Sequence, residues 1–318
     1  MSTLSPDKTQ AWKTTVTHNI TKSLKSLFKP DTILWIAPAT MASFISKGKK
    51  LGYPIIFDPH ALQSFYFSNK LILYTKYQRF LFKNLQALFL ENTFFNQANL
   101  LIASSAIDAT RIQKKSPKSK VQIIQNCLNT KQYGQLRKTL GHTLFFSGSL
   151  NDPSNIEGLN WFCNEIIPRL KAVLKTKMPR IIVAGSNPSL EFKSRLEASQ
   201  IEVYANPNDI MPYLSEALLV FVPVHFGKGG RQKILQAMAA GRPVITTGKG
   251  AEGFSLTPMK DIYIADQTDT FTSAMIRLIR DHDFRQKMIT NAIHTVEAHY
   301  DWRAVRPILK KLFEEFMT

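Results

Sequence analysis

The stretch of residues 219–253 constrains the fold more than any other part of this sequence, because it predicts a complete strand–loop–helix–strand unit. Residues 219–224 read L-V-F-V-P-V, a short apolar run that is typical of a buried strand. A helix is expected to begin near Arg231, Pro243 prevents its continuation, and residues 244–247 form the next strand. Three glycines lie between the first strand and the helix, where the backbone must turn sharply: Gly227, Gly229 and Gly230.

The glycine loop and the start of this helix have the chemistry of an anion site. A helix N-terminus presents unpaired N–H groups and the positive end of the helix dipole, and Gly229 and Gly230 let a phosphate approach the backbone. Lys228, Arg231 and Lys233 add cationic donors at the same place. One interpretation is a diphosphate site. The other is an ordinary helix start with basic residues in solvent, and the loop alone does not decide between them.

A longer match favours the diphosphate interpretation. From Phe226 to Thr247 the sequence reads F-G-K-G-G-R-Q-K-I-L-Q-A-M-A-A-G-R-P-V-I-T-T, and G-A-E-G follows at residues 250–253. This stretch resembles a pattern of the group 1, or family 4, glycosyltransferases, F-G-G-G-T-R-L-K-I-L-E-A-M-A-x-G-x-P-V-V-x-T followed by G-A-E-G. The resemblance implies a retaining enzyme that moves a sugar from a nucleotide-diphosphate donor to a hydroxyl of a glycan, a lipid-linked sugar or a cell-surface polysaccharide. It also implies no metal or other cofactor, because Arg231, Lys233 and the loop N–H groups stabilise the leaving diphosphate.

Strand and helix patterns alternate along the chain, which predicts parallel sheets. The resemblance adds the architecture: an α/β protein with two Rossmann-like domains facing a cleft, the B-type glycosyltransferase fold. We expect a shortened, acceptor-side domain over residues 1–137 and a nucleotide-sugar-binding domain over residues 138–318, whose last helix crosses back to the first domain. The first domain is expected to lack its opening strand–helix units, so that its sheet is smaller, rebuilt or completed by a partner chain. We expect strands at residues 32–36, 54–57, 100–104 and 121–124, and then at 144–146, 180–184, 201–204, 219–224, 244–247 and 261–265.

The resemblance also implies roles for single residues. Gln236 would hold the ribose, and Glu252 of the G-A-E-G motif would lie near the sugar or the ribose edge. Ser149, in the first turn of the second domain, takes the place of an arginine that binds the diphosphate in much of the family. His60 follows a predicted strand and is the catalytic candidate, in contact with the sugar or the acceptor. A histidine hydrogen-bonded within its own loop is an equal alternative.

One departure from the family pattern bears on activity. Many group 1 enzymes carry two glutamates, separated by seven residues, around the glycine loop, and here these places hold Lys228 and Gln236. Gln236 can still accept a hydrogen bond from ribose, whereas Lys228 cannot accept one and would bind phosphate or the carboxylate of an acidic sugar. The alternative to an enzyme is therefore a degenerate, non-catalytic binding or scaffold subunit with the same fold.

The charge and the composition limit the binding partners and the cellular compartment that we expect. The net charge of +18 implies attraction to nucleic acid, to an anionic membrane surface or to phosphorylated substrates, and the absence of a base-reading motif disfavours nucleic acid. The pattern of residues 12–28 predicts a basic amphipathic helix. Its apolar face favours packing against the protein core over binding to a membrane surface. Cys127 and Cys163 are the only cysteines, and neither a secretory signal nor an apolar run of roughly 18 residues is seen. We therefore expect a cytoplasmic protein, with peripheral association at the inner face of the membrane as an option.

Overall fold

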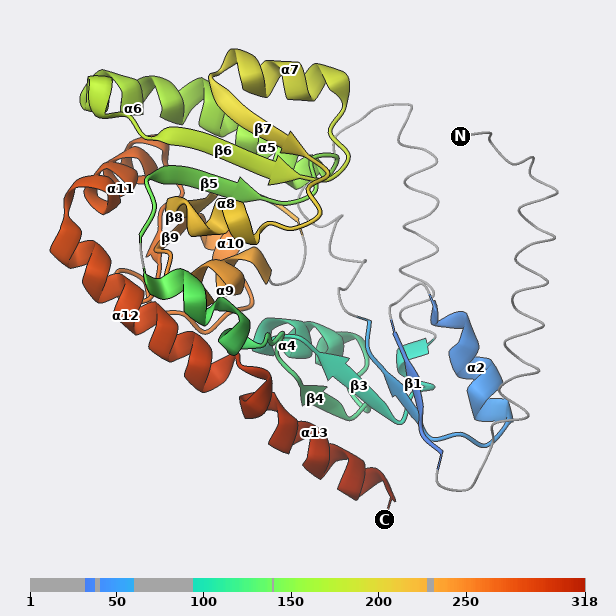
Figure 1. The fold of residues 1–318 in the computed structure, drawn as a ribbon. Helices are drawn as coiled ribbons and strands as arrows, with labels where there is room; N and C mark the ends of the chain where they lie inside the picture. Colours follow the sequence, from blue (N-terminus) through green and yellow to red (C-terminus); the bar gives the residue numbers. More distant parts are fainter. Residues whose placement is uncertain (1–31, 38–40, 60–93, 139, 228–231, 318) are drawn as a thin grey trace. The chain divides into compact units, whose positions relative to one another are not determined.

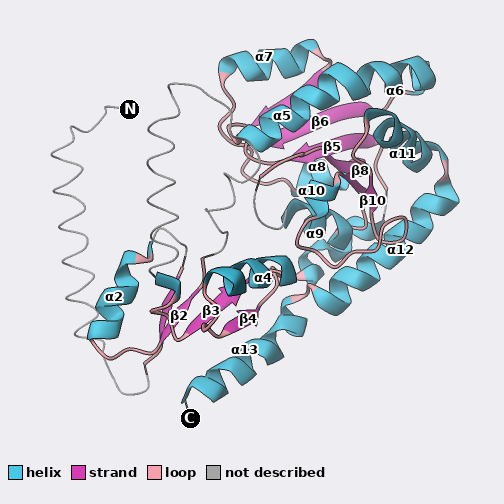
Figure 2. Ribbon diagram, turned by 180° about the vertical axis from the view of Figure 1, so that it is seen from behind, coloured by secondary structure: helices cyan, strands magenta, loops and turns pink. Residues whose placement is uncertain are grey.

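The computed structural model describes residues 32–37, 41–59, 94–138, 140–227 and 232–317 (Figure 1). The chain forms two compact units, which are described separately. Unit 1 comprises Met1–Ile124 and Lys310–Thr318, and unit 2 is Gln125–Leu309. Each unit contains a parallel sheet with helices packed on it, which confirms the predicted α/β class (Figure 2). The amphipathic helix predicted at 12–28 lies outside the described residues.

Unit 1 is built on a four-stranded parallel sheet in the order β1-β2-β3-β4. Ile45 and Ile112, which lie on different helices, are buried with Phe57 on one face of this sheet. On the other face the neighbouring strand residue Ile56 packs with Leu312 of the C-terminal helix, because successive side chains of a strand point to opposite faces. The elements are β1 (Leu34–Ile36), α2 (Ser43–Lys50), β2 (Ile55–Phe57), β3 (Leu100–Ala103), α4 (Ala106–Lys115) and β4 (Val121–Ile123).

Unit 2 is built on a six-stranded parallel sheet in the order β10-β9-β8-β5-β6-β7 (Figure 1). Its strands are β5 (Thr143–Ser147), β6 (Arg180–Gly185), β7 (Ile201–Ala205), β8 (Ala217–Val222), β9 (Val244–Thr246) and β10 (Tyr263–Ile264). The chain begins this sheet at β5, adds β6 and β7 on one side, and then returns to add β8, β9 and β10 on the other. This order is that of a Rossmann-like domain, as the sequence predicts, and its direction reverses between β5 and β8.

Helices cover both faces of the unit 2 sheet (Figure 2). Side chains of β5 alternate between the two cores, so that Phe146 lies in one and Phe145 in the other. The core around Phe146 is closed by α5 (Pro153–Trp161), a π-helical turn (Phe162–Ile166), α6 (Ile167–Leu174), α7 (Leu190–Ala198) and α11 (Thr268–Arg280). The core around Phe145 is closed by α8 (Met211–Ser215), α9 (Gln232–Ala239) and part of α12 (His282–His299). The remaining elements include the 3-10 segments η4 (Thr130–Lys138) and η6 (Lys175–Lys177), α10 (Gly248–Ala251) and α13 (Trp302–Met317).

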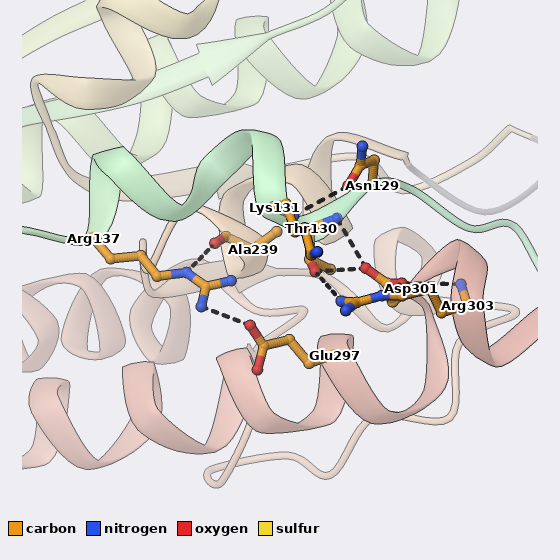
Figure 3. A network of polar contacts seen from close by, with 8 residues as sticks. All are labelled: Asn129, Thr130, Lys131, Arg137, Ala239, Glu297, Asp301 and Arg303. Carbon is orange, nitrogen blue, oxygen red and sulfur yellow. Dashed lines mark hydrogen bonds and ion pairs between the residues drawn. The ribbon is translucent and has the colours of Figure 1, made fainter.

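A buried carboxylate ties the segment that enters unit 2 to the start of α13 (Figure 3). Leu128 forms an isolated parallel bridge with Asp301. The Asp301 side chain is 1% exposed and accepts hydrogen bonds from the Thr130 N–H at 3.1 Å and from the Thr130 hydroxyl at 2.6 Å. The guanidinium of Arg303 donates to the other carboxylate oxygen at 2.6 Å. Both chain segments at the edge of unit 2 are therefore fixed by one side chain.

The rest of the entering segment packs along α9. From η4, Arg137 donates to the Ala239 carbonyl oxygen at 2.8 Å and to the Glu297 carboxylate at 2.7 Å (Figure 3). The buried guanidinium of Arg242 donates to the Leu136 carbonyl oxygen at 2.6 Å. Residues 125–137, which the sequence analysis places in the first domain, therefore fold with unit 2, and the division falls after Ile124. The last residues of α13 belong to unit 1.

Within the part of the chain that the structure describes, no helix combines the length and the apolar character that crossing a bilayer requires.

Asp301→Asn is expected to destabilise unit 2 by about 2 kcal/mol at pH 7, because hydrogen bonds to a buried charged group stabilise more than neutral ones. The hydrogen bond from Arg303, followed by those from Thr130, holds the pKa of Asp301 well below its usual range. A pKa depressed in the folded state gives stabilisation that is present above the unfolded-state pKa and is lost as the pH falls toward the folded-state value. The difference in free energy of unfolding between wild type and D301N, from urea titrations, should therefore narrow between about pH 4 and pH 3.

Asp269→Asn is a matched control, since the Asp269 side chain is 90% exposed and should change stability little. If the difference in free energy of unfolding between wild type and D301N stayed the same at every pH, the buried charge would not be its cause.

Candidate functional site

The carboxyl ends of β5 and β8 are where unit 2 is expected to bind a ligand. The two strands are adjacent and parallel, with Leu144 opposite Leu219 and Phe145 opposite Val220. The chain leaves β5 toward α5 in one core and leaves β8 toward α9 in the other. Loops that diverge in this way form a crevice beyond the ends of the strands, which is the usual ligand site of parallel α/β sheets.

The turn after β5 is shaped by Gly148 and Asn155. Gly148 has a φ of +154°, and its N–H donates to the Ala184 carbonyl oxygen at 3.1 Å. Asn155 is buried at the start of α5, and its amide nitrogen donates to the Ser149 carbonyl oxygen at 2.8 Å. The Ser149 hydroxyl donates to the Asn151 side-chain oxygen at 2.5 Å. Ser149, a predicted donor-binding residue, therefore lies in a braced turn at the carboxyl end of β5.

Lys233 reaches this turn from the first turn of α9. Its ammonium nitrogen lies 4.0 Å from the centroid of the Phe146 ring, in a cation–π contact, and 3.3 Å from the Asn155 side-chain oxygen. A Cβ on Gly148 would lie only 2.5 Å from this nitrogen, so the absence of a side chain at Gly148 leaves the space that the lysine occupies. The fold thus brings Lys233 together with the turn that contains Ser149, two residues that the sequence predicts for one site.

Two neighbouring helix N-termini are already capped by side chains. The Asp152 carboxylate accepts the N–H groups of Ser154, at 2.8 Å, and of Asn155, at 3.3 Å, at the start of α5. At the start of α10 the Thr247 hydroxyl accepts the Gly250 N–H at 3.0 Å, and the Gly248 N–H donates to the Asp266 carboxylate at 2.8 Å. An added anion at either helix would meet a carboxylate, so the charge of Lys233 favours the start of α9 for an anion.

The loop after β8 is held against α5. The His225 ring lies 4.6 Å from the Trp161 ring in an edge-on contact, and its Nδ1 lies 3.4 Å from a Glu157 carboxylate oxygen. Gly158 permits the close approach, since a Cβ there would lie 2.0 Å from the Pro223 carbonyl oxygen. These contacts fix the direction in which the chain enters the predicted anion loop.

Gln236 and Glu252 lie at two different helices of unit 2. Gln236 lies half-buried on α9. Glu252, just after α10, accepts from the Lys249 ammonium at 2.7 Å. Both roles assigned from the sequence stay predictions.

The remaining site residues of the sequence analysis lie outside the described residues. They are His60, Lys228, Gly229, Gly230 and Arg231. Their roles likewise stay predictions. Among the residues that the structure does describe, no group of three or more His, Cys, Asp or Glu side chains is arranged to hold a metal ion.

The sequence analysis assigns no role to Phe146, Gly148 or Asn155. The run Ser-Gly-Ser after an apolar strand is a local signal that marks a turn, and it could have drawn attention to Gly148.

Comparisons with known proteins bear on the family and the fold. Residues 141–281 match the family model described as Glycosyl transferases group 1. An uncharacterised 44.6 kDa protein in the cps region of Klebsiella pneumoniae is 24% identical over 170 residues, which are 51% of this chain and 43% of that protein. The matched region therefore spans less than half the length of this relative.

Two solved structures illustrate the similarity of the fold. Anabaena Alr3699/HepE in complex with UDP and glucose has a TM-score of 0.70 and 14% identity, over 93% of this chain and 80% of that chain. An α,α-trehalose 6-phosphate synthase from Burkholderia multivorans has a TM-score of 0.73 and 11% identity, over 99% of this chain and 78% of that chain. At such low identity the similarity establishes the fold and nothing finer.

Gly148→Ala is expected to push the Lys233 ammonium away from the turn, because the new Cβ would lie 2.5 Å from its nitrogen and 3.1 Å from the Asn155 amide nitrogen. The strain at a φ of +154° should cost about 1 kcal/mol of stability. Affinity for inorganic pyrophosphate, measured by calorimetry, should fall about 5- to 10-fold as the cation is displaced.

Gly134→Ala serves as the control, because no heavy atom lies within 4 Å of a Cβ placed there. Equal pyrophosphate affinities for the two alanine variants would refute the role of the Gly148 turn in placing Lys233.

Proposed function

Residues 141–281 form a domain of the glycosyl transferases group 1 family, and from this premise we propose that the protein transfers a sugar from a nucleoside diphosphate donor to a hydroxyl acceptor, with retention at the anomeric carbon. The B-type glycosyltransferase fold of the chain supports this proposal. The bond between the anomeric carbon and the diphosphate breaks, a bond to the acceptor oxygen forms, and the acceptor gives up its proton. Negative charge develops on the leaving diphosphate, so the site must stabilise an anion.

The observation that carries the proposal is the placement of Lys233. Its ammonium lies at the carboxyl end of β5, against the Gly148 turn and the Phe146 ring, while Asp152 caps the neighbouring helix α5. We assign to Lys233, together with Arg231 and the N–H groups of the glycine loop, the binding of the diphosphate, in place of a metal ion. A lysine is a point charge with three rotatable donors and suits phosphate oxygens.

The other donor contacts follow from the resemblance. Gln236 would accept a ribose hydroxyl, Glu252 would lie near the sugar, and Lys228 would meet a phosphate or an acidic group of the sugar. His60 would contact the sugar or the acceptor. Alr3699/HepE, whose fold is similar, is described in complex with UDP and UDP-glucose, and this makes UDP the first nucleotide to test.

We propose a growing polysaccharide or a lipid-linked sugar as the acceptor. The relative in the cps region of Klebsiella pneumoniae supports a polysaccharide-related role. Lysines end two helices of unit 1: Lys47, Lys49 and Lys50 lie in the last turn of α2, and Lys114 and Lys115 end α4. Near an anionic lipid surface each such residue contributes about 1 kcal/mol of attraction, which would bring the enzyme to a lipid-linked acceptor.

UDP, GDP or ADP at about 100 times its dissociation constant should stabilise the protein by about 2.7 kcal/mol without metal, which corresponds to a rise in Tm of roughly 5–10 °C. Lys233→Met keeps the packing on Phe146 but removes the charge, and it should weaken nucleotide binding about 10-fold or more. The measurement is a thermal unfolding scan against a nucleotide series, followed by a sugar-transfer assay with the base that binds.

Lys193→Met is the matched control, because Lys193 lies on α7 and pairs there with Glu197, so nucleotide binding should be unchanged. No stabilisation by any of the three nucleotides would disprove the donor site. Binding without transfer of any sugar would instead favour the non-catalytic scaffold subunit, which the replacement of the glutamate pair by Lys228 and Gln236 suggests.

A further inference from the structure

The unit 2 sheet ends at β7, and one face of this edge strand carries polar and aromatic side chains. β7 is the last strand in the sheet order and is paired with β6 (Figure 1). Ile201 and Val203 face the core that α7 helps to close. Because successive side chains of a strand alternate between the faces, Glu202 and Tyr204 lie on the other face, the one that α8 covers in part.

Two tyrosine rings form an aromatic platform on this face. Tyr204 is 39% exposed, and the centroid of its ring lies 4.5 Å from that of Tyr213 on α8. Tyr213 stacks in turn on the buried Phe145 of β5, with the two centroids 6.4 Å apart and an angle of 17° between the planes. The platform is therefore anchored in the core at one end, while its outer ring remains open to solvent.

A row of polar contacts continues from the outer ring along the same face. The Tyr204 hydroxyl donates to the Glu202 carboxylate at 3.4 Å. The guanidinium of Arg180, the first residue of β6, lies 3.5 Å from the Glu202 carboxylate and 3.1 Å from that of Glu216. Each of these charged side chains is reachable from solvent. Because one guanidinium holds two carboxylates, the row presents donors and acceptors in fixed positions with little net charge.

These groups together favour one class of ligand. The ring of a sugar has a face of apolar C–H groups, which can pack on an aromatic ring, and a rim of hydroxyls that both donate and accept hydrogen bonds. An anion at this face would meet the two carboxylates, and a cation would meet the guanidinium. A neutral, hydroxyl-rich ligand avoids both conflicts, because paired carboxylates and guanidinium groups keep further sites for hydrogen bonds.

We propose that Tyr204, Glu202 and Arg180 form a second carbohydrate-binding site, which holds a neutral stretch of a glycan chain with one sugar packed on the Tyr204 ring. The site is separate from the proposed donor site, because β6 lies between β7 and β5 and the Phe146 ring that Lys233 contacts lies on the opposite face of the sheet. The inference rests on the proposed function only in taking the glycan to be the acceptor. Two sites on one polymer bind it more tightly than either does alone, so this surface would keep the enzyme on its acceptor.

The test measures the binding of three neutral glycans, maltohexaose, cellohexaose and isomaltohexaose, to the full chain by saturation-transfer NMR without nucleotide. At least one of them should bind the wild type. Tyr204→Ala should weaken that binding about 3- to 10-fold, because the ring on which the sugar packs is lost. Tyr204→Phe keeps the ring and should cost less than about 2-fold. Tyr204 is partly exposed at the edge of the sheet, so both variants should remain folded.

Three controls accompany this titration. Leu190→Ala is the matched variant, since Leu190 is an apolar side chain that is 86% exposed, on the helix that covers the other face of β7, and it should leave glycan affinity unchanged. The affinity of Tyr204→Ala for UDP, measured by calorimetry, should equal that of the wild type. Glycan affinity should be the same at about 0.05 M and about 0.5 M salt, because a neutral ligand has no charge to screen.

Four outcomes would overturn the inference. They are no binding of any of the three glycans to the wild type, unchanged glycan affinity in Tyr204→Ala, and equal losses of glycan and UDP affinity, which would assign Tyr204 to the donor site. The fourth is a change from dimer to monomer in Tyr204→Ala by analytical ultracentrifugation, which would make the edge of β7 an interface between two copies. Glycan binding by a wild type that binds no nucleotide would instead overturn the donor site and support the carbohydrate site by itself.

Discussion

The buried carboxylate of Asp301 is the constraint on which the arrangement of unit 2 depends. Removing a charged group from water is costly unless hydrogen bonds replace the lost solvation, and here Thr130 and Arg303 supply them. Those donors are in place only if the entering segment lies beside the start of α13, as the bridge between Leu128 and Asp301 requires. The path by which the chain enters unit 2 and the path by which it leaves are therefore one structural feature, although 171 residues separate Thr130 from Asp301.

This constraint extends to α9, the helix that carries Lys233. One side of α9 packs on the sheet through buried residues such as Leu235, and the other contacts the entering segment through Arg137. Arg242, which follows the helix, is 1% exposed, and its guanidinium donates to carbonyl oxygens of Leu136 and Leu214. Burial lowers the pKa of Arg242 to about 10, so it remains charged at neutral pH and keeps these hydrogen bonds. A helix held on both sides can place a cation reproducibly over the Gly148 turn.

Local patterns in the sequence were sufficient to predict most of the fold. Short apolar runs located the strands within a few residues, and Pro243 marked the end of α9, where the structure places Gly241 at a φ of +70°. The limits appear where a contact joins distant segments. The sequence analysis placed residues 125–137 with the first domain, while their assignment to unit 2 depends on Asp301 and on α9. The site shows the same limit: Lys233 was predicted from its loop, but Gly148, which makes room for it, lies far earlier in the chain.

The charges at the proposed donor site matter more for the choice of the nucleotide-sugar than the fold does. Asp152 and Asp266 accept backbone N–H groups, and Glu252 is paired with Lys249, so these carboxylates are engaged. The two glutamates of the common family pattern would accept hydrogen bonds from the sugar and from the ribose. In the proposed donor site, Gln236 would keep an acceptor oxygen for the ribose without the charge, whereas Lys228 would only donate at the sugar. The proposed roles therefore favour a sugar that offers an acceptor, and a carboxylate would satisfy the lysine better than a neutral hydroxyl, because it adds charge attraction to the hydrogen bond.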